Sequence, residues 1–155
     1  MSSLHPREYR QDDLVRVLAI FDSNVPEFFT IPERTDFEAF LNDLPGPYLV
    51  IEDARGDLVA CGGYAIVPAE SRADLCWGMV SLKQHGRGIG RTLTQLRIEA
   101  ARSDPRVDSV ILNTSQHTRG FYETLGFVTE RVVVDGFAPG LDRCDMRLTA
   151  RAERR

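Results

Sequence analysis

Gln84-His85-Gly86-Arg87-Gly88-Ile89-Gly90-Arg91 places three alternate glycines and two arginines between a predicted strand and a predicted helix. Glycines at such a junction let the backbone approach a ligand and turn its N–H groups inward, and the following helix adds the positive end of its dipole. This combination favours an anion, most often a phosphate. The stretch is therefore predicted to be a phosphate-binding loop.

Two other phosphate loops fit this stretch poorly. A Walker loop ends in Gly-Lys-Ser/Thr, so that the lysine reaches the phosphates, but here Arg91 and Thr92 follow Gly90. The dinucleotide fingerprint is Gly-x-Gly-x-x-Gly near the start of a doubly wound sheet, whereas this chain has Gly-x-Gly-x-Gly beyond its midpoint. A tight turn without a ligand remains the alternative interpretation of so short a pattern.

The stretch resembles the acetyl-CoA pyrophosphate loop of the GNAT superfamily of N-acetyltransferases, whose pattern is Gln/Arg-x-x-Gly-x-Gly/Ala between a strand and a helix. His85 departs from that pattern at the usual Gln/Arg position. A second block, Thr118-Arg119-Gly120-Phe121-Tyr122-Glu123-Thr124-Leu125-Gly126-Phe127, resembles the family's next element, a short helix with Phe-Tyr-x-x-x-Gly-Phe. One predicted helix and one apolar strand separate the two blocks, and this spacing suits the family.

Length and composition indicate one globular domain. The 155 residues can form one proper core, and no repeat, low-complexity tract or linker divides them. We expect residues 1–150 to form the domain and residues 151–155 a short basic tail. A net charge of −4 argues against a nucleic-acid binder, whereas an acidic surface suits cationic partners.

The cysteines and the N-terminus favour a cytoplasmic protein. Cys61, Cys76 and Cys144 show neither a paired disulfide framework nor a metal-ligand spacing, so we expect reduced thiols and no metal site. The chain begins without an apolar signal core, and no run is long enough to cross a bilayer. We therefore expect a soluble, unexported protein that does not associate with membranes.

Hydrophobic periodicity predicts the order strand, two helices, three strands, helix, strand, helix and two strands. The predicted helices carry apolar residues at helical spacing, over Leu14–Phe21, Phe37–Leu44 and Ile89–Ala100 and around Tyr122. The predicted strands are short apolar runs, near Pro6–Tyr9 and at Tyr48–Ile51, Leu58–Ala60, Leu75–Val80, Val107–Leu112, Val128–Val134 and Cys144–Leu148. This order matches the mixed α/β fold of the GNAT family, a twisted, mostly antiparallel sheet with flanking helices, in which the fourth and fifth strands splay apart.

Two helix starts are predicted from polar side chains that can accept a hydrogen bond from a free backbone N–H. Asp12 or Asp13 is expected to cap the first helix, and Thr114 or Ser115 the helix around Tyr122. Gly126 is expected to close the latter helix.

The resemblance implies transfer of an acetyl group from acetyl-CoA to a primary amine by direct attack. An amine attacks a thioester only as the neutral base, and an alkyl ammonium has a pKa of about 10.4, so a base must take its proton. In the family a carboxylate, often acting through water, takes the proton, and a tyrosine meets the leaving thiolate. Tyr122 matches that tyrosine, and Asp74 resembles the family's fourth-strand glutamate. Glu27 and Glu33 are rival bases.

The resemblance also implies which residues bind acetyl-CoA. They lie at the end of the strand before the loop, in the loop, in and after the next strand, and in the Tyr122 helix: Val80, Leu82, His85, Gly86, Arg87, Gly88, Ile89, Gly90, Arg91, Asn113, Ser115 and Tyr122. Arg87 and Arg91 suit phosphate oxygens because guanidinium groups form paired hydrogen bonds with them. The family often has Asn at the position of Ser115, so Asn113 is a second candidate for the contact with the pantetheine arm.

The acceptor is predicted only as a class of amine. Glu27, Phe28 and Phe29 lie in a proline-broken segment and are expected to bind substrate. Together with the stretch 136–142, they combine aromatic and acidic side chains that suit a small cationic amine, and a peptide N-terminus or a lysine suits them too. A role in filling the core beneath a loop is the alternative for both phenylalanines.

Three alternatives to this function stay open. The chain could use another acyl donor or acceptor, or it could be a regulator that binds acyl-CoA without turnover. A nucleophilic relay of Cys76 with His85 or His117 is a third possibility. A homodimer is compatible with the fold, although no sequence feature decides it.

Overall fold

The computed structural model describes residues 3–149, and the predicted tail at 151–155 lies outside the described residues. Its strands form one hydrogen-bonded sheet in the order β1-β2-β3-β4-β5-β7-β6. The pairs β1–β2, β2–β3, β5–β7 and β6–β7 are antiparallel, whereas β4 and β5 are parallel. The predicted mixed α/β class with a mostly antiparallel sheet is therefore confirmed.

The elements follow the predicted order. The strands are β1 His5–Glu8, β2 Tyr48–Glu52, β3 Leu58–Val67, β4 Arg72–Val80, β5 Ser109–Thr114, β6 Val128–Ala138 and β7 Leu141–Thr149. The helices are α1 Leu14–Ser23, α2 Glu33–Asn42, α3 Ile89–Arg102 and α4 Arg119–Glu123, with short 3-10 turns η1 Gln11–Asp13, η2 Pro68–Glu70 and η3 Leu82–Gln84. Several strands extend beyond the apolar runs that predicted them, because pairing with a neighbour also satisfies the backbone of polar residues.

By its internal contacts the chain divides into two compact units. The first unit comprises Met1–Ala65 and Cys76–Arg97, and the second comprises Ile66–Leu75 and Ile98–Arg155. The division passes through β4, so that Asp74 belongs to the second unit and the strand's last five residues belong to the first.

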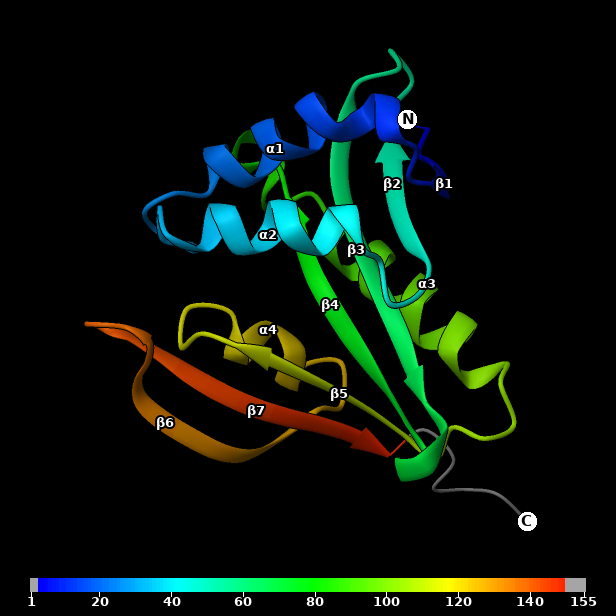
Figure 1. Cartoon of the computed structure of the whole chain (residues 1–155), viewed down its shortest axis with the longest axis vertical. Coiled ribbons are helices and arrows are strands. Elements are labelled where there is room, and N and C mark those ends of the chain that lie inside the picture. Colours follow the sequence, from blue (N-terminus) through cyan, green and yellow to red (C-terminus); the bar gives the residue numbers. More distant parts are fainter. Residues whose placement is uncertain (1–2, 150–155) are drawn as a thin grey trace. The chain divides into compact units, whose positions relative to one another are not determined.

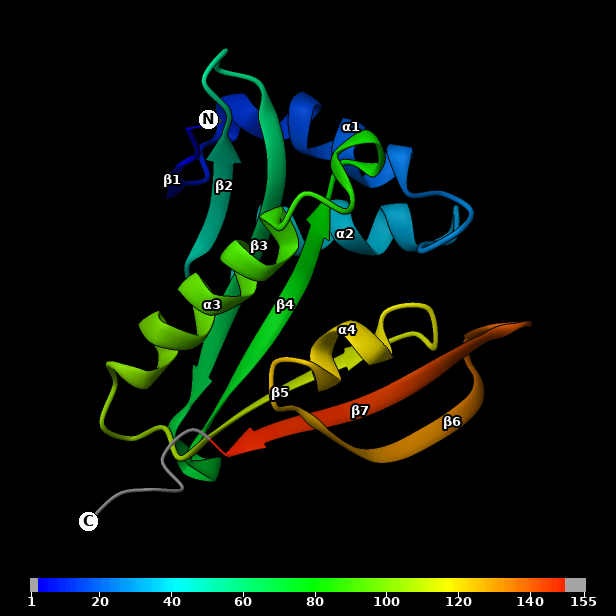
Figure 2. The ribbon, with the colours of Figure 1, turned by 180° about the vertical axis from the view of Figure 1, so that it is seen from behind.

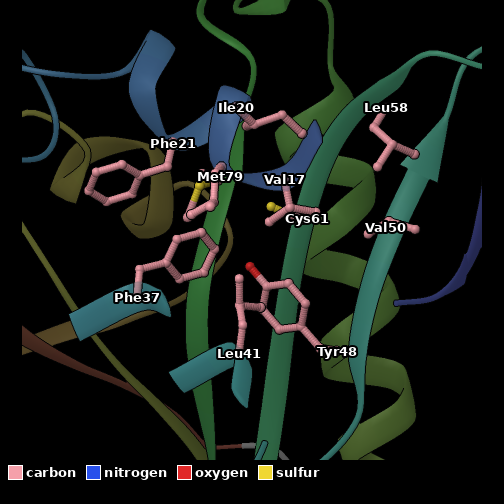
Figure 3. Packing of buried hydrophobic residues seen from close by; sticks show 11 residues of the cluster. Val17, Ile20, Phe21, Phe37, Leu41, Tyr48, Val50, Leu58, Cys61 and Met79 are labelled. Carbon is pink, nitrogen blue, oxygen red and sulfur yellow. The ribbon is translucent and has the colours of Figure 1, made fainter. Parts of the chain in front are cut away.

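In the first unit, helices cover both faces of β2 and β3. Helices α1 and α2 lie on one face and α3 lies on the other, as the two opposite views show (Figures 1 and 2). Phe21 and Phe37 pack with Tyr48 and Met79 in the core below α1 and α2 (Figure 3). On the other face, Ile89 and Leu93 of α3 pack against buried residues of β2 and β3, namely Ile51, Val59 and Ala60.

In the second unit, β7 lies between β5 and β6, and α4 connects β5 to β6 (Figure 2). Gly126 has φ of +99° and its N–H donates to the carbonyl of Glu123, as expected of a glycine that closes a helix. The predicted cap of this helix is wrong. Helix α4 begins only at Arg119, so Thr118 occupies the N-cap position, while the Ser115 hydroxyl accepts a hydrogen bond from the N–H of His117.

The predicted caps of α1 are also wrong, since no side chain caps this helix. Asp13 occupies the N-cap position, but its fully buried carboxylate accepts hydrogen bonds from the side chains of Arg7 and Arg16 and from the Arg10 N–H. The hydrogen bond from Arg7 holds the pKa of Asp13 far below its usual range. The carboxylate therefore ties β1 and η1 to the start of α1.

Asp13→Asn is expected to lower the free energy of unfolding at pH 7 by about 3 kcal/mol, because it removes one charge of a buried ion pair. A depressed folded-state pKa stabilises the protein above the unfolded-state pKa of about 3.9, and this stabilisation is lost as the pH falls toward the folded-state pKa. The difference in free energy of unfolding between wild type and Asp13→Asn should therefore become smaller below about pH 4. Urea unfolding of both proteins at pH 7 and in acid measures this difference.

Asp12→Asn is the matched control, since Asp12 is the exposed neighbour of Asp13. It should leave the stability almost unchanged at both pH values. An Asp13→Asn protein as stable as wild type at pH 7 would show that the buried carboxylate does not stabilise the fold.

Candidate functional site

The glycine loop lies between β4 and α3, where the sequence places it. Gly86 and Gly88 have φ of +80° and +82°, in the left-handed region that favours glycine. A Cβ atom built on either residue would meet no heavy atom within 4 Å, so the space beside the loop backbone is open. The backbone conformation at both positions thus favours glycine. The open space beside them gives a ligand direct access to the main chain.

Helix α3 begins directly after this turn. Ile89 is buried in the core, which anchors the first turn of the helix. The Thr92 N–H donates to the carbonyl of Gly88, and the Thr94 hydroxyl donates to the carbonyl of Gly90. The first N–H groups of a helix have no partner within it, so this end of α3 offers donors and a positive dipole to an anion.

Two arginines lie in and directly after the glycine loop. Arg87 and Arg91 are exposed, and within residues 3–149 neither forms an ion pair with a carboxylate. Most other arginines with described contacts pair with an acid, as Arg34 does with Asp22 and Glu38. The loop therefore combines free backbone donors, a helix start and two available guanidinium groups, which together can bind a phosphate.

The end of β4 that leads into the loop is hydrogen-bonded to the C-terminal end of α1. The Val80 carbonyl accepts hydrogen bonds from the Asn24 amide and from Nε2 of His85, each at 2.9 Å. The Leu82 N–H donates to the Ser23 hydroxyl at 3.0 Å. Ser23 and Asn24 were not predicted as site residues, because their only signal is their polarity beside prolines.

His85 and the predicted substrate residues lie in the same unit. The His85 ring centroid is 5.2 Å from that of Phe28, so these two side chains meet beside the loop. Phe29 instead stacks on Phe21 at 4.9 Å and packs against the core. Glu27 is exposed. Phe29 thus takes the core-filling position, whereas Glu27 and Phe28 remain accessible candidates for substrate binding.

Tyr122 lies on α4 in the second unit. Its ring contacts Phe121 and Phe127 in edge-on arrangements, with centroids 5.0 and 5.8 Å away. The ring is half-buried, and in the described part of the chain no group hydrogen-bonds its hydroxyl. Packing therefore orients the ring while the hydroxyl stays available to a ligand.

The candidate bases differ in their surroundings. Asp74 lies within β4 and pairs with Arg72, whose Nε is 2.7 Å from Oδ1. Glu33 accepts hydrogen bonds from the N–H and the hydroxyl of Thr30, so it serves the start of α2. Glu27 is exposed and Asp74 is half-buried. The structure thus gives Glu33 and Asp74 local partners and leaves Glu27 exposed, and all three stay predictions as bases.

The two candidates for the pantetheine contact lie near the end of β5, with Asn113 inside the strand and Ser115 directly after it. Asn113, with its amide nitrogen facing the acceptors, donates to Oδ1 of Asp145 at 2.8 Å. Ser115 is buried, and its hydroxyl serves the turn before α4. Both remain predictions as ligand contacts.

Gln116, which was not predicted as a site residue, is hydrogen-bonded to the β6–β7 hairpin that contains the stretch 136–142. The Gln116 amide donates to the Gly140 carbonyl at 2.8 Å and accepts from the Asp142 N–H at 2.9 Å. Gln116 thereby joins the turn before α4 to the hairpin tip. No local sequence pattern indicates such a contact, because its partners lie more than twenty residues away.

Cysteines and possible metal ligands were also located in the described residues. None of the three cysteines forms a disulfide bond, and burial raises the pKa of the Cys61 thiol to about 12. Within the described range, no group of three His, Cys, Asp or Glu side chains is arranged to hold a metal ion. The described helices include none with the length and apolar character needed to cross a membrane.

Comparison with known proteins places these features in a family. The model of the acetyltransferase (GNAT) family matches residues 14–127, which include both the glycine loop and the Tyr122 helix. No curated protein matches the chain by sequence. Solved structures do match, and their identities of 16 to 25% mainly report a shared fold.

Three solved structures illustrate the likeness. A protein assigned to the GNAT family from Desulfovibrio desulfuricans is 25% identical, with a TM-score of 0.73, and the match covers 97% of this chain and 99% of that one. The ribosomal-protein-S18-alanine N-acetyltransferase from Escherichia coli is 16% identical, with a TM-score of 0.77 and coverages of 94% and 93%. Spermidine/spermine N-acetyltransferase from Vibrio cholerae is 18% identical, with a TM-score of 0.70 and coverages of 96% and 93%.

Proposed function

Because the chain belongs to the acetyltransferase (GNAT) family, we propose that it transfers an acetyl group from acetyl-CoA to a primary amine. The observation that carries this proposal is the loop at Gly86 and Gly88, whose left-handed backbone is open to a ligand. A side chain at either position would fill the space that a pyrophosphate needs to reach the backbone N–H groups.

The residues of the loop fit the charge of acetyl-CoA. Its pyrophosphate is an anion, which the start of α3 can stabilise together with Arg87 and Arg91, for which residues 3–149 provide no ion-pair partner. We assign the pantetheine arm to Val80 and Leu82, which precede the loop, with Asn113 and Ser115 as further candidates. The side chains of Asn24 and Ser23 would keep the end of β4 in place while the arm binds.

In the proposed reaction the amine nitrogen attacks the thioester carbonyl carbon, a C–N bond forms and the C–S bond breaks. A base takes one proton from the amine, and we assign this role to Asp74, with Glu27 as the rival. The electron pair of the C–S bond leaves on sulfur, and the Tyr122 hydroxyl supplies a proton or a hydrogen bond to it. The thiol of CoA and an amide are the products.

The acceptor is proposed as a small cationic amine or the amine of a peptide. A net charge of −4 and the exposed Glu27 beside Phe28 favour a cation. Structures of similar fold include enzymes named for a polyamine and for a protein alanine, so the family accommodates both kinds of acceptor.

Turnover of acetyl-CoA against a panel of polyamines, small monoamines and peptides tests the proposal. Release of free thiol that depends on the amine, together with an acetylated product in the mass spectrum, is the expected result. Binding of acetyl-CoA without turnover on any amine would favour the alternative that the protein is a regulator that binds acyl-CoA. Turnover with a longer acyl-CoA but not with acetyl-CoA would favour another donor.

Asp74→Asn is expected to lower kcat by about 10²-fold at neutral pH, because general bases contribute at least this much. Part of the rate should return at high pH, where more of the amine is neutral. CoA affinity should stay unchanged. A pH–rate profile of the purified variant measures these effects.

Arg72→Gln is the matched control for Asp74→Asn. It breaks the same ion pair but keeps the carboxylate, so it should retain most of the turnover if Asp74 acts as the base. A wild-type profile for Asp74→Asn, with a reduced kcat for Glu27→Gln, would move the role of base to Glu27.

A further inference from the structure

A buried arginine in α3 has no place in the reaction described so far. The Arg97 side chain is only 1% exposed, and within residues 3–149 no carboxylate pairs with it. Its Nη1 donates to the Gly63 carbonyl at 3.3 Å, and its Nε has no hydrogen-bond partner. Arginine keeps its positive charge in proteins, and burying an unpaired charge is costly. The buried guanidinium of Arg97 therefore calls for a structural or functional explanation.

The sheet makes room for this guanidinium with glycines. A Cβ atom at Gly78 would lie 2.5 Å from Nη2 of Arg97, and one at Gly62 would lie 3.1 Å from its Cζ. Neither glycine has a positive φ, so their backbones could accept a larger residue. Arg97 therefore requires a small residue at Gly78, whereas a Cβ atom at Gly62 would also lie 3.1 Å from the Cα atom of Gly78.

Arg97 contacts β4 where this strand is distorted. Trp77, the residue before Gly78, has φ of +43°, which is rare outside glycine and interrupts the pleat of a strand. The Trp77 carbonyl accepts a hydrogen bond from the Tyr48 hydroxyl at 2.8 Å. Tyr48 belongs to the core under α1 and α2, whereas Arg97 comes from α3 on the other face (Figures 1 and 2). The kink is thus held from both faces of the sheet.

The kink is close to the residues assigned to the acyl donor. Gly78 precedes Val80 by two residues, which corresponds to about 7 Å along a strand. Strained backbone in such a position is maintained only when its surroundings determine it. A positive charge in a low-dielectric site also stabilises negative charge that develops nearby during acyl transfer.

We propose that Arg97 is a positioning residue of the acetyltransferase site. Its guanidinium supports the kink of β4 at Trp77 and Gly78 and places a buried positive charge beside the strand that carries the acyl donor. The catalytic part of this inference rests on the proposed function, whereas the support of the kink does not.

The test compares wild type with Arg97→Met, which keeps an extended side chain but removes the charge and the fork of donors. Arg102→Met is the matched control, since Arg102 is an exposed arginine of the same helix. The first readout is the set of Trp77 backbone ¹³C chemical shifts, which report a left-handed conformation. We expect Arg97→Met to lose that signature and Arg102→Met to keep it. A wild-type signature in Arg97→Met would overturn the proposal, whether or not the protein has activity.

The second readout is kinetic, on an amine that the wild-type protein acetylates. We expect kcat of Arg97→Met to fall about tenfold, since small displacements of a reacting group cost this much or more, with KM for acetyl-CoA within about twofold. An arginine that only stabilises the fold would change stability without lowering kcat at a nearly constant KM. An unchanged kcat would therefore overturn the proposed positioning of the acetyltransferase site by Arg97. Absence of turnover in wild type would refute the proposed function instead, and the Trp77 shifts would still decide whether Arg97 supports the kink.

Arg97→Lys is the variant to test if Arg97→Met does not fold. Arg97→Lys keeps the charge but lacks the planar fork, so it should fold and show a weakened Trp77 signature with a smaller loss of kcat. Wild-type shifts and wild-type kcat in Arg97→Lys would overturn the proposal.

Discussion

Replacing Tyr122 with phenylalanine is expected to lower kcat by about 10²–10⁴-fold, the range that a positioned general acid contributes. An alkyl thiolate is a poor leaving group in an apolar site unless a donor meets it, and the Tyr122 hydroxyl is the donor that we propose. The contacts of the ring with Phe121 and Phe127 need no hydroxyl, so the fold and the acetyl-CoA affinity should stay close to wild type. Steady-state kinetics on a confirmed amine substrate measure the effect.

The pattern of the loss identifies its cause. Equal losses in kcat and kcat/KM would mark an interaction made mainly in the transition state. Tyr64→Phe is the matched control, because it removes a hydroxyl from another half-buried tyrosine and should leave kcat unchanged. If chemistry limits the rate and Tyr122→Phe stays within about twofold of wild type, Tyr122 has no part in the mechanism.

Gly88→Val should abolish most of the CoA affinity. Valine at φ of +82° is strained, and its branched side chain would occupy the open space beside the loop. Two lost charge-assisted hydrogen bonds correspond to about 3–4 kcal/mol, or about 10²–10³-fold in Kd. Calorimetric titration with CoA on the folded variant measures this loss.

The hairpin between β2 and β3 provides a control for the strain itself. Gly56 has φ of +84° and open space around it, so Gly56→Val introduces nearly the same backbone penalty far along the chain from the loop. Both variants should lose similar stability in urea, and only Gly88→Val should lose CoA binding. Undiminished affinity in a folded Gly88→Val protein would refute the assignment of the phosphate loop.

Local sequence patterns predicted the features that depend on neighbouring residues. The spacing of Gly86, Gly88 and Gly90 before an amphipathic run predicted a glycine loop at the start of a helix, and α3 does begin at Ile89. The structure adds that Gly86 and Gly88 have φ values in the left-handed region. Apolar periodicity likewise predicted the order of helices and strands. Such features follow from backbone sterics and from one buried face, which each segment carries within itself.

Contacts between distant segments were not predictable in this way. Asp13 has the residue type of a helix cap, yet its carboxylate pairs with Arg7 of the preceding strand, because a buried charge is costly unless an opposite charge pairs with it. Asn24 and Gln116 gave no signal, since their hydrogen-bond partners Val80, Gly140 and Asp142 are distant in the sequence.

The sequence by itself determined the family, the order of the elements and the glycine loop, because two local motifs and their spacing carry this information. Only the tertiary structure decided that Phe29 packs into the core while Phe28 contacts His85. It alone showed that Arg97, one of many arginines in the sequence, is buried against Gly78 at the kink of β4. The physical reason is that burial and long-range pairing depend on which segments pack together, and no local pattern encodes that choice.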